Sequence, residues 1–277
     1  MEIGNRIRQR RKELGMTQEE LASAVYVTPQ AISQWENGKT VPDIYKIRLI
    51  ADALKMDRAD LIDDEVKNRP SWIVKDQFYS VDNMRRKLKA FAEEEGLQET
   101  SRAIDYAEEM HRGQYRKTSD WSEEKVPYIV HPFIMACHAH ALGIRDDTVL
   151  AAVLLHDVCE DCGIRPEELD YSSSVQEAVR LLTKQKGWDP AVYFSGIEGS
   201  STASIVKALD RCNNLSTMML AFTEEDIIEY IDETETWILP LLDHIKKEYP
   251  QYYDAAFVLK YQILSLIESI KAAVLRL

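Results

Sequence analysis

Histidines and carboxylates gather in four separated segments of this 277-residue chain. Each segment combines residue types that ligate metals or transfer protons, and the four are residues 111–117, 128–132, 154–161 and 207–214. Residues three or four apart share one face of a helix, so Asp157 would lie beside Glu160 and Asp161. By the same rule, Asp210 would share a face with Asn214. Both faces are candidates for metal binding and general acid–base chemistry.

The adjacent pair His156-Asp157 closes the apolar run of residues 151–155. Burying two such polar groups is costly unless something pairs with them, and a divalent cation would supply that pairing. A hard cation held by such side chains lowers the pKa of a bound water, which becomes nucleophilic near neutral pH. Taken alone, a His-Asp pair is as often a surface pair. The hypothesis of a metal-dependent hydrolase therefore depends on the other three segments.

The ordered motifs between about Ser101 and Glu233-Thr234 resemble the HD-domain metal phosphohydrolases. Within that group they resemble the hydrolase domain of the RelA/SpoT family, which removes pyrophosphate from the alarmones ppGpp and pppGpp. The resemblance implies one divalent cation, usually Mn²⁺ in that family. The residues that it assigns to the metal are His131, His156, Asp157 and Asp210.

The same resemblance assigns further polar residues to water and substrate. Glu160 and Asp161 would orient and deprotonate the attacking water. Arg116 and Lys117 would contact the nucleotide, where their charge offsets that of the phosphates. Asn214 would contact the ribose or the surroundings of the metal.

Two departures from the family pattern bear on substrate and activity. Residues 118–126 stand between Lys117 and Pro127, where the family commonly has a short turn. This insertion would lie at the rim of the pocket and change the substrate preference. About forty residues follow Glu233, too few for the synthetase and regulatory regions of the family, so we expect hydrolysis without synthesis.

The first 62 residues predict short helices. Thr17 with Glu20 three residues later forms a capping box, and Thr28 followed by Pro29 is an N-cap with proline at the first helical position. Five helices are expected, the last two at about residues 43–54 and 57–62. Because only three residues separate the second helix from the third, the pair predicts a helix-turn-helix.

Residues 16–22 and 27–39, together with Pro42, resemble an Xre/Cro-type DNA-binding domain. The resemblance implies that the third helix enters the major groove of double-stranded DNA. It assigns base reading to Gln30, Ser33 and Gln34, and phosphate contacts to Gln18, Asn37 and Lys39. A solvated helix face is the alternative for the base-reading positions. Tyr26 stands where the family usually has Gly, which predicts a positive φ at a cost of about 1 kcal/mol.

Charge and helical periodicity divide the chain into parts. Residues 1–62 hold 10 Lys/Arg against 9 Asp/Glu, whereas residues 63–277 hold 24 against 38, so only the first part is suited to approach a nucleic acid. The rest of the chain predicts helices throughout, at about 98–112, 132–142, 147–159, 174–186, 201–217, 224–247 and 253–276. We therefore expect an all-α protein. Its expected parts are a DNA-binding domain at 1–62, a polar linker with a connecting helix at 63–95 and an HD-type phosphohydrolase domain at 96–277.

Other reactive side chains have simpler explanations. His138 is seven residues from His131 and is a rival ligand, but a packed or solvated histidine explains it better. Cys159-x-x-Cys162 lacks both the second Cys-x-x-Cys of a zinc site and the βαβ pattern of a thioredoxin. The apolar stripe of residues 257–270 is explained by core packing or by a dimer interface.

No apolar run reaches the roughly 20 residues that span a bilayer, and the N-terminus does not resemble a signal peptide, so we expect a cytoplasmic protein without a membrane partner. Four cysteines are too few for a disulfide scaffold. The predicted function is that of a DNA-binding homodimer whose second domain hydrolyses the 3′-pyrophosphate of (p)ppGpp, a guanine nucleotide polyphosphate. Two alternatives are a hydrolase of another phosphorylated nucleotide, such as NADPH at its 2′-phosphate or a nucleoside monophosphate, and a non-enzymatic repressor that senses a nucleotide.

Overall fold

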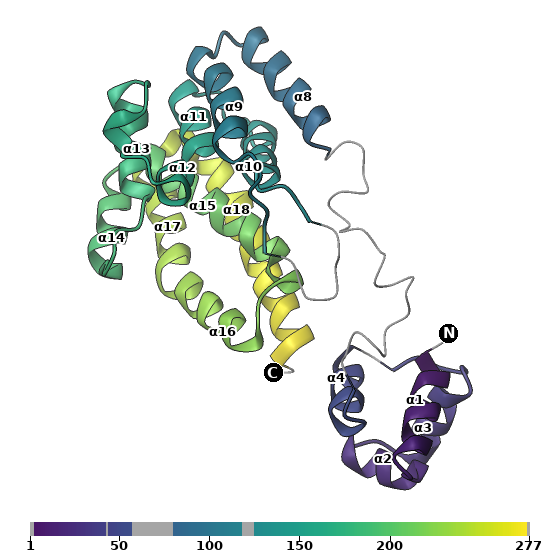
Figure 1. Ribbon diagram of the computed structural model, residues 1–277. Helices are drawn as coiled ribbons and strands as arrows, with labels where there is room; N and C mark the ends of the chain where they lie inside the picture. Colours follow the sequence, from purple (N-terminus) through teal and green to yellow (C-terminus); the bar gives the residue numbers. More distant parts are fainter. Residues whose placement is uncertain (1–2, 43, 57–79, 118–124, 276–277) are drawn as a thin grey trace. The chain divides into compact units, whose positions relative to one another are not determined.

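A computed structural model describes residues 3–42, 44–56, 80–117 and 125–275. These residues form helices and one isolated β-bridge, with no strand among them, so the all-α prediction is confirmed for the described part of the chain. The chain divides into two compact units, which contain α1 to α4 and α8 to α18 (Figure 1). Within the described ranges, no helix is long and apolar enough to cross a membrane.

The first unit is built on the capping signals of its sequence. Its described helices are α1 (Ile3–Glu13), α2 (Gln18–Ala24), α3 (Pro29–Glu36) and α4 (Ile44–Ala53). Thr17 and Glu20 form the expected capping box, and the Thr28 side chain accepts a hydrogen bond from the Ala31 backbone N–H. Tyr26 has a φ of 56°, as its place in the turn predicts. The fifth expected helix, at residues 57–62, lies outside the described residues.

The second unit packs around two buried helices. Its helices are α8 (Val81–Glu94), α9 (Gln98–Met110), α10 (Val130–Ala141), α11 (Asp147–Leu155), α12 (Val158–Cys162), α13 (Ser173–Leu182), α14 (Pro190–Glu198), α15 (Ser201–Thr217), α16 (Glu224–Glu233), α17 (Leu239–Glu248) and α18 (Tyr253–Ile270). Every residue of α11 from Val149 onward is buried, because α9, α10, α13 and α15 all pack against it. α15 in turn contacts α10, α17 and α18. These two helices carry or adjoin most of the candidate site.

Three helices differ from the expected pattern. The predicted helix 147–159 is broken between α11 and α12, the predicted helix 224–247 contains a π-helical turn at Thr234–Ile238, and α14 was not expected. At the first break, the Val153 carbonyl oxygen lies 2.8 Å from His156 Nδ1. In a continuous helix that carbonyl accepts the N–H of Asp157, so the imidazole competes for the same acceptor. The interruption falls at the two residues of the His-Asp pair.

Two further segments have packing roles that the sequence left open. α8, expected as a connecting helix, contributes Met84 and Leu88 to the core of the second unit. The apolar stripe of α18 is mainly core, since Ile263 and Ile267 are buried, whereas Phe257 at its start is 60% exposed. The buried positions of this stripe are unavailable to a second copy of the chain, so a dimer interface there would use only the exposed positions.

Candidate active site

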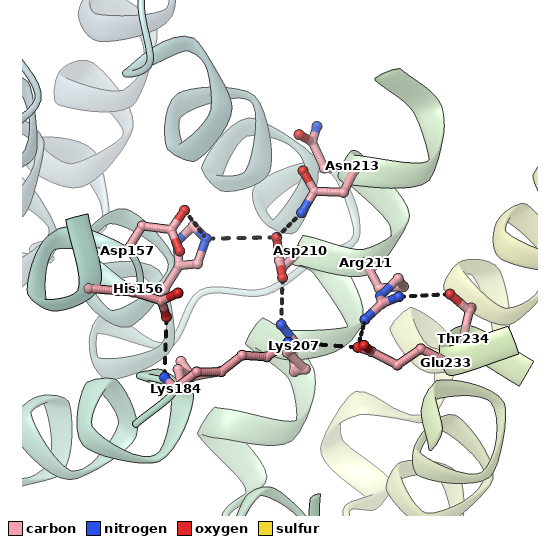
Figure 2. Close-up of polar contacts among 12 residues, drawn as sticks. His156, Asp157, Lys184, Lys207, Asp210, Arg211, Asn213, Glu233 and Thr234 are labelled. Atoms are coloured by element: carbon pink, nitrogen blue, oxygen red, sulfur yellow. Dashed lines mark hydrogen bonds and ion pairs between the residues drawn. The ribbon is translucent and has the colours of Figure 1, made fainter. Parts of the chain in front are cut away.

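Four polar side chains from three segments of the chain converge in the second unit. His131 lies in the first turn of α10, His156 and Asp157 lie between α11 and α12, and Asp210 lies in α15. His156 Nε2 is 3.0 Å from Asp157 Oδ2, and His131 Nε2 is 3.3 Å from Asp210 Oδ1 and 3.7 Å from Asp157 Oδ2. Figure 2 shows His156, Asp157 and Asp210 grouped at this point. The structure thus brings together all four residues expected as metal ligands.

This donor set fits a divalent cation. One ligand atom from each of His131, His156 and Asp157 lies within 4.8 Å of the others, and Asp210 Oδ1 is 3.8 Å from His156 Nε2. His156 Nε2 is buried and makes no hydrogen bond, whereas Nδ1 is held by a backbone carbonyl. Once the ring loses its Nε2 proton, it keeps the donor at Nδ1 and presents a lone pair at Nε2, which is the arrangement of a metal-ligating histidine.

His131 is oriented by a residue that the sequence analysis missed. Its Nδ1 lies 2.6 Å from Asn213 Oδ1, and both side chains are buried. Burial lowers the pKa of His131, so the ring is neutral and Nε2 carries a lone pair. Asn213 directly precedes Asn214 and lies three residues after Asp210, so it shares the face already singled out. One sequence signal could have identified Asn213: a metal-ligating imidazole needs a hydrogen-bond acceptor for the ring nitrogen that does not bind the metal.

Asp210 is held by two donors, one on each oxygen. Lys207 Nζ donates to Oδ2 at 2.8 Å, and Asn214 Nδ2 donates to Oδ1 at 2.5 Å. Burial alone would raise the pKa of Asp210, but the ammonium of Lys207 and the nearby imidazoles hold it well below its usual range. The carboxylate is therefore charged, as a ligand must be.

Tyr128 connects Asp157 with the acidic turn that follows it. The Tyr128 hydroxyl donates to Asp157 Oδ2 at 2.6 Å, and burial together with this carboxylate raises its pKa, so it remains a neutral donor. Burial and the charge of Asp157 raise the pKa of Asp161, to which Tyr128 also hydrogen-bonds. A raised pKa makes a carboxylate a better proton acceptor near neutral pH.

Glu160 and Arg116 are positioned by contacts across the unit. Glu160 is exposed on α12, and its Oε2 accepts the backbone N–H of Lys184 at 3.2 Å. Arg116 Nη2 donates to Asn214 Oδ1 at 3.0 Å and to Thr217 Oγ1 at 3.3 Å. The guanidinium thus reaches Asp210 through Asn214.

The two segments that flank the insertion between Lys117 and Pro127 are hydrogen-bonded to each other. The Arg116 backbone N–H donates to the Val126 carbonyl at 2.9 Å, and the Tyr128 N–H donates to the Gln114 carbonyl at 3.0 Å. Lys117 is exposed, and residues 118–124 lie outside the described residues. The two ends of the segment are therefore paired with each other, which keeps Arg116 and Tyr128 at the site.

The expected DNA-reading positions share one face of α3 in the first unit. Gln30 and Gln34 are exposed, and Ser33 is half-buried. Asn37 Nδ2 donates to the Ser33 carbonyl at 2.8 Å, which places it against the end of the same helix.

The expected phosphate contacts lie beside that helix. Gln18 Nε2 donates to Glu36 Oε2 at 2.8 Å, and Glu36 is itself paired with the buried Arg11. Lys39 is exposed just beyond α3. The Gln18–Glu36 hydrogen bond joins the start of α2 to the end of α3.

Comparisons with known proteins agree with both units. A helix-turn-helix family model matches residues 7–61. The guanosine-3′,5′-bis(diphosphate) 3′-pyrophosphohydrolase MESH1 of Xenopus tropicalis is 39% identical over 141 residues, which cover 46% of this chain and 76% of that protein. The chain belongs to this pyrophosphohydrolase family.

Two longer relatives match this chain over a smaller share of their own length. The guanosine-3′,5′-bis(diphosphate) 3′-pyrophosphohydrolase of Aquifex aeolicus is 30% identical over 165 residues, 52% of this chain. The chain spans 21% of the length of that protein. The probable GTP pyrophosphokinase of Mycobacterium leprae is 32% identical over 144 residues, which cover 47% of this chain and 17% of that protein. A solved structure of a metazoan SpoT ortholog described as hydrolysing ppGpp is 22% identical and covers 62% of this chain and 95% of that one, with a TM-score of 0.48.

The rival residues of the candidate site are explained by packing. Among the described residues, His138 does not belong to the cluster of possible metal ligands, and burial lowers its pKa while its ring hydrogen-bonds to Gln262. Cys159 and Cys162 are free thiols. Burial raises the pKa of Cys159 to about 11, which leaves it protonated and unreactive near neutral pH.

Cation binding at this cluster should release a proton. Burial alone would lower the pKa of His156, but the carboxylates of Asp157 and Asp210 raise it to about 9. Below that pH the ring is protonated, and a ligating imidazole must be neutral, so the cation has to displace the proton. We expect the affinity for Mn²⁺ to fall about tenfold for each pH unit between about pH 8 and pH 6. Titration calorimetry in two buffers of different ionisation enthalpy measures the released protons, and an affinity that does not change with pH would contradict the expectation.

Proposed function

We propose that this protein is a metal-dependent hydrolase that removes pyrophosphate from the 3′ position of ppGpp and pppGpp, leaving GDP or GTP. The observation that carries the proposal is the convergence of two imidazoles and two carboxylates, in which His156 Nε2 lies 3.0 Å from Asp157 Oδ2 and His131 Nε2 lies 3.3 Å from Asp210 Oδ1. Membership of the pyrophosphohydrolase family supports the same reaction. Water adds to the phosphorus that is bonded to the 3′-oxygen, and that oxygen leaves with a proton.

We infer that His131, His156, Asp157 and Asp210 hold one divalent cation, with Mn²⁺ as the expected ion. When bound, the cation supplies positive charge that polarises the phosphoryl group and lowers the pKa of a water. The surrounding residues fix its ligands, because Asn213 sets the ring of His131 and Lys207 engages the second oxygen of Asp210. Tyr128 does the same for Asp157.

The residues around this centre divide the remaining tasks. Glu160 and Asp161 follow Asp157 within one turn, and we infer that they orient the attacking water and accept its proton. Arg116 and Lys117 bind the negatively charged nucleotide. Asn214 links Arg116 to Asp210, so we infer that it couples nucleotide binding to the position of a metal ligand.

A panel assay tests this function. The Mn²⁺-loaded protein is incubated with ppGpp, NADPH and nucleoside monophosphates, and released pyrophosphate and orthophosphate are measured separately. Pyrophosphate from ppGpp alone is the expected result. Orthophosphate from the other nucleotides would favour the alternative hydrolase, and tight nucleotide binding without release would favour a sensor. The charged pair at positions 160 and 161 supports catalysis, because a sensor needs no group that accepts a proton from water.

We further propose that the first unit binds double-stranded DNA in the cytoplasm as part of a homodimer. The exposed face of α3 and the match to a helix-turn-helix family support this. A single such module offers a small interface, so two copies on a two-fold-related site would supply the area that specific binding needs. The proposed domains are residues 1–62 and 96–277, joined by residues 63–95, of which the connecting helix α8 packs into the core of the second unit.

Substitutions on and beside α3 should separate base reading from phosphate contact. We expect Gln34→Ala to relax sequence preference at one base step by about 1 to 3 kcal/mol, because glutamine reads adenine through two hydrogen bonds. Lys39→Ala should weaken binding to all sequences alike. Selection from random duplexes followed by titration at several salt concentrations measures both effects.

The matched control for these substitutions is Gln9→Ala, an exposed glutamine on α1. Its affinity and preference should equal those of the wild type. A selection that enriches no motif with folded protein would rule out specific DNA binding. A motif without two-fold symmetry would rule out the dimer.

A further inference from the structure

Three basic side chains lie on the Oδ2 side of Asp210: Lys207, Arg211 and Lys184 (Figure 2). Lys207 contacts Oδ2 itself. Arg211 is buried and paired with Glu233, and it also donates to Thr234 Oγ1 at 3.0 Å. Two of the three cations therefore already have close partners.

Lys184 has the loosest ion pair of this group. Its Nζ lies 3.9 Å from Glu233 Oε1, and that oxygen is also the partner of Arg211. The ammonium instead sits over the ring of Trp188, at 4.2 Å from the ring centre. Burial and the charge of Lys207 lower the pKa of Lys184. An anion placed beside this ammonium would offset that crowding of positive charge.

Lys184 also adjoins the carboxylate assigned to the attacking water. Its backbone N–H is the donor to Glu160 Oε2, and Figure 2 shows its side chain running toward Lys207 and Glu233. Arg116 reaches Asp210 from the other oxygen, Oδ1, through Asn214. The chain thus has cations on both sides of one metal ligand.

A 3′-diphosphate has two phosphates, and each needs positive charge beside it. On the proposed function, Arg116 binds the nucleotide and the divalent metal ion binds the phosphate that water attacks. The second phosphate, which leaves as part of pyrophosphate, needs its own positive charge. We propose that Lys184 binds this distal phosphate and thereby makes the site select a 3′-diphosphate over a 3′-monophosphate.

The test compares two guanosine 5′-diphosphates that differ only in carrying a diphosphate or a monophosphate at the 3′ position. Lys184→Met removes the charge and keeps the length of the side chain. We expect kcat/KM for the diphosphate to fall about 10- to 100-fold, as for loss of one charge-assisted contact, with a change of less than about threefold for the monophosphate. Lys184→Arg should restore most of the loss. Lys186→Met, an exposed lysine two residues away, is the matched control and should behave as the wild type.

A second readout does not depend on turnover. The dissociation constants of both nucleotides are measured with the Mn²⁺-loaded Glu160→Gln protein, with and without Lys184→Met, together with thermal midpoint and metal content. Loss of discrimination between the two nucleotides supports the proposal. Equal loss for both, or no loss for either, overturns it. Failure of the wild type to hydrolyse ppGpp would refute the proposed function, whereas the ratio of dissociation constants would still decide the role of Lys184.

Discussion

The Asp157→Asn protein is expected to lose its metal and its activity together. Asp157 Oδ2 lies within 3.0 Å of His156 Nε2 and 3.7 Å of His131 Nε2, so it is central to the cluster. Asparagine keeps the shape but removes the charge that a hard cation needs. Loss of a residue that only hydrogen-bonds to a metal ligand costs about 10- to 100-fold in metal affinity or activity. Loss of a ligand itself should therefore lower the metal affinity by about 10²-fold or more. The measurements are bound Mn²⁺ per chain and the rate of pyrophosphate release.

Two further variants make this result specific. His156→Ala should have the same effect, because it removes the buried Nε2 that faces Asp157 and Asp210. His138→Gln is the matched control, since it alters the rival histidine, and it should keep full metal content and rate. Stoichiometric metal with full turnover in Asp157→Asn or His156→Ala would remove the cluster from the mechanism.

Glu160→Gln is expected to keep the metal and lose the rate. Glutamine can still accept the Lys184 backbone N–H through its carbonyl oxygen, so the local contact survives. The amide cannot take a proton from water, and loss of a general base typically costs about 10²- to 10⁴-fold in rate. Single-turnover hydrolysis of ppGpp at saturating Mn²⁺ measures the effect.

The control for this second substitution is Glu167→Gln, which neutralises an exposed glutamate a short distance along the chain. It should match the wild type in rate and metal content. If Glu160→Gln retains the wild-type rate, the base must be sought at Asp161, where Asp161→Asn provides the corresponding test.

The sequence by itself determined the local structure and the identity of the cluster. The capping box at Thr17 and Glu20 and the Thr28-Pro29 start of α3 depend on residues within one turn, and both were found where expected. The family resemblance assigned the four ligand candidates, and the cost of burying polar groups beside an apolar run independently singled out the pair His156-Asp157. Their convergence followed from the order of the motifs and their resemblance to a family.

Only the tertiary structure decided which neighbours serve those residues. His131 pairs with Asn213 across 82 positions of sequence, and the sequence analysis assigned no role to Asn213. Lys184 drew no attention as a lysine near the end of a helix, yet folding brings its backbone to Glu160 and its ammonium to Glu233. Helical spacing specifies contacts three or four residues apart. Contacts between helices depend on how α10, α12 and α15 pack, and no local pattern encodes that packing.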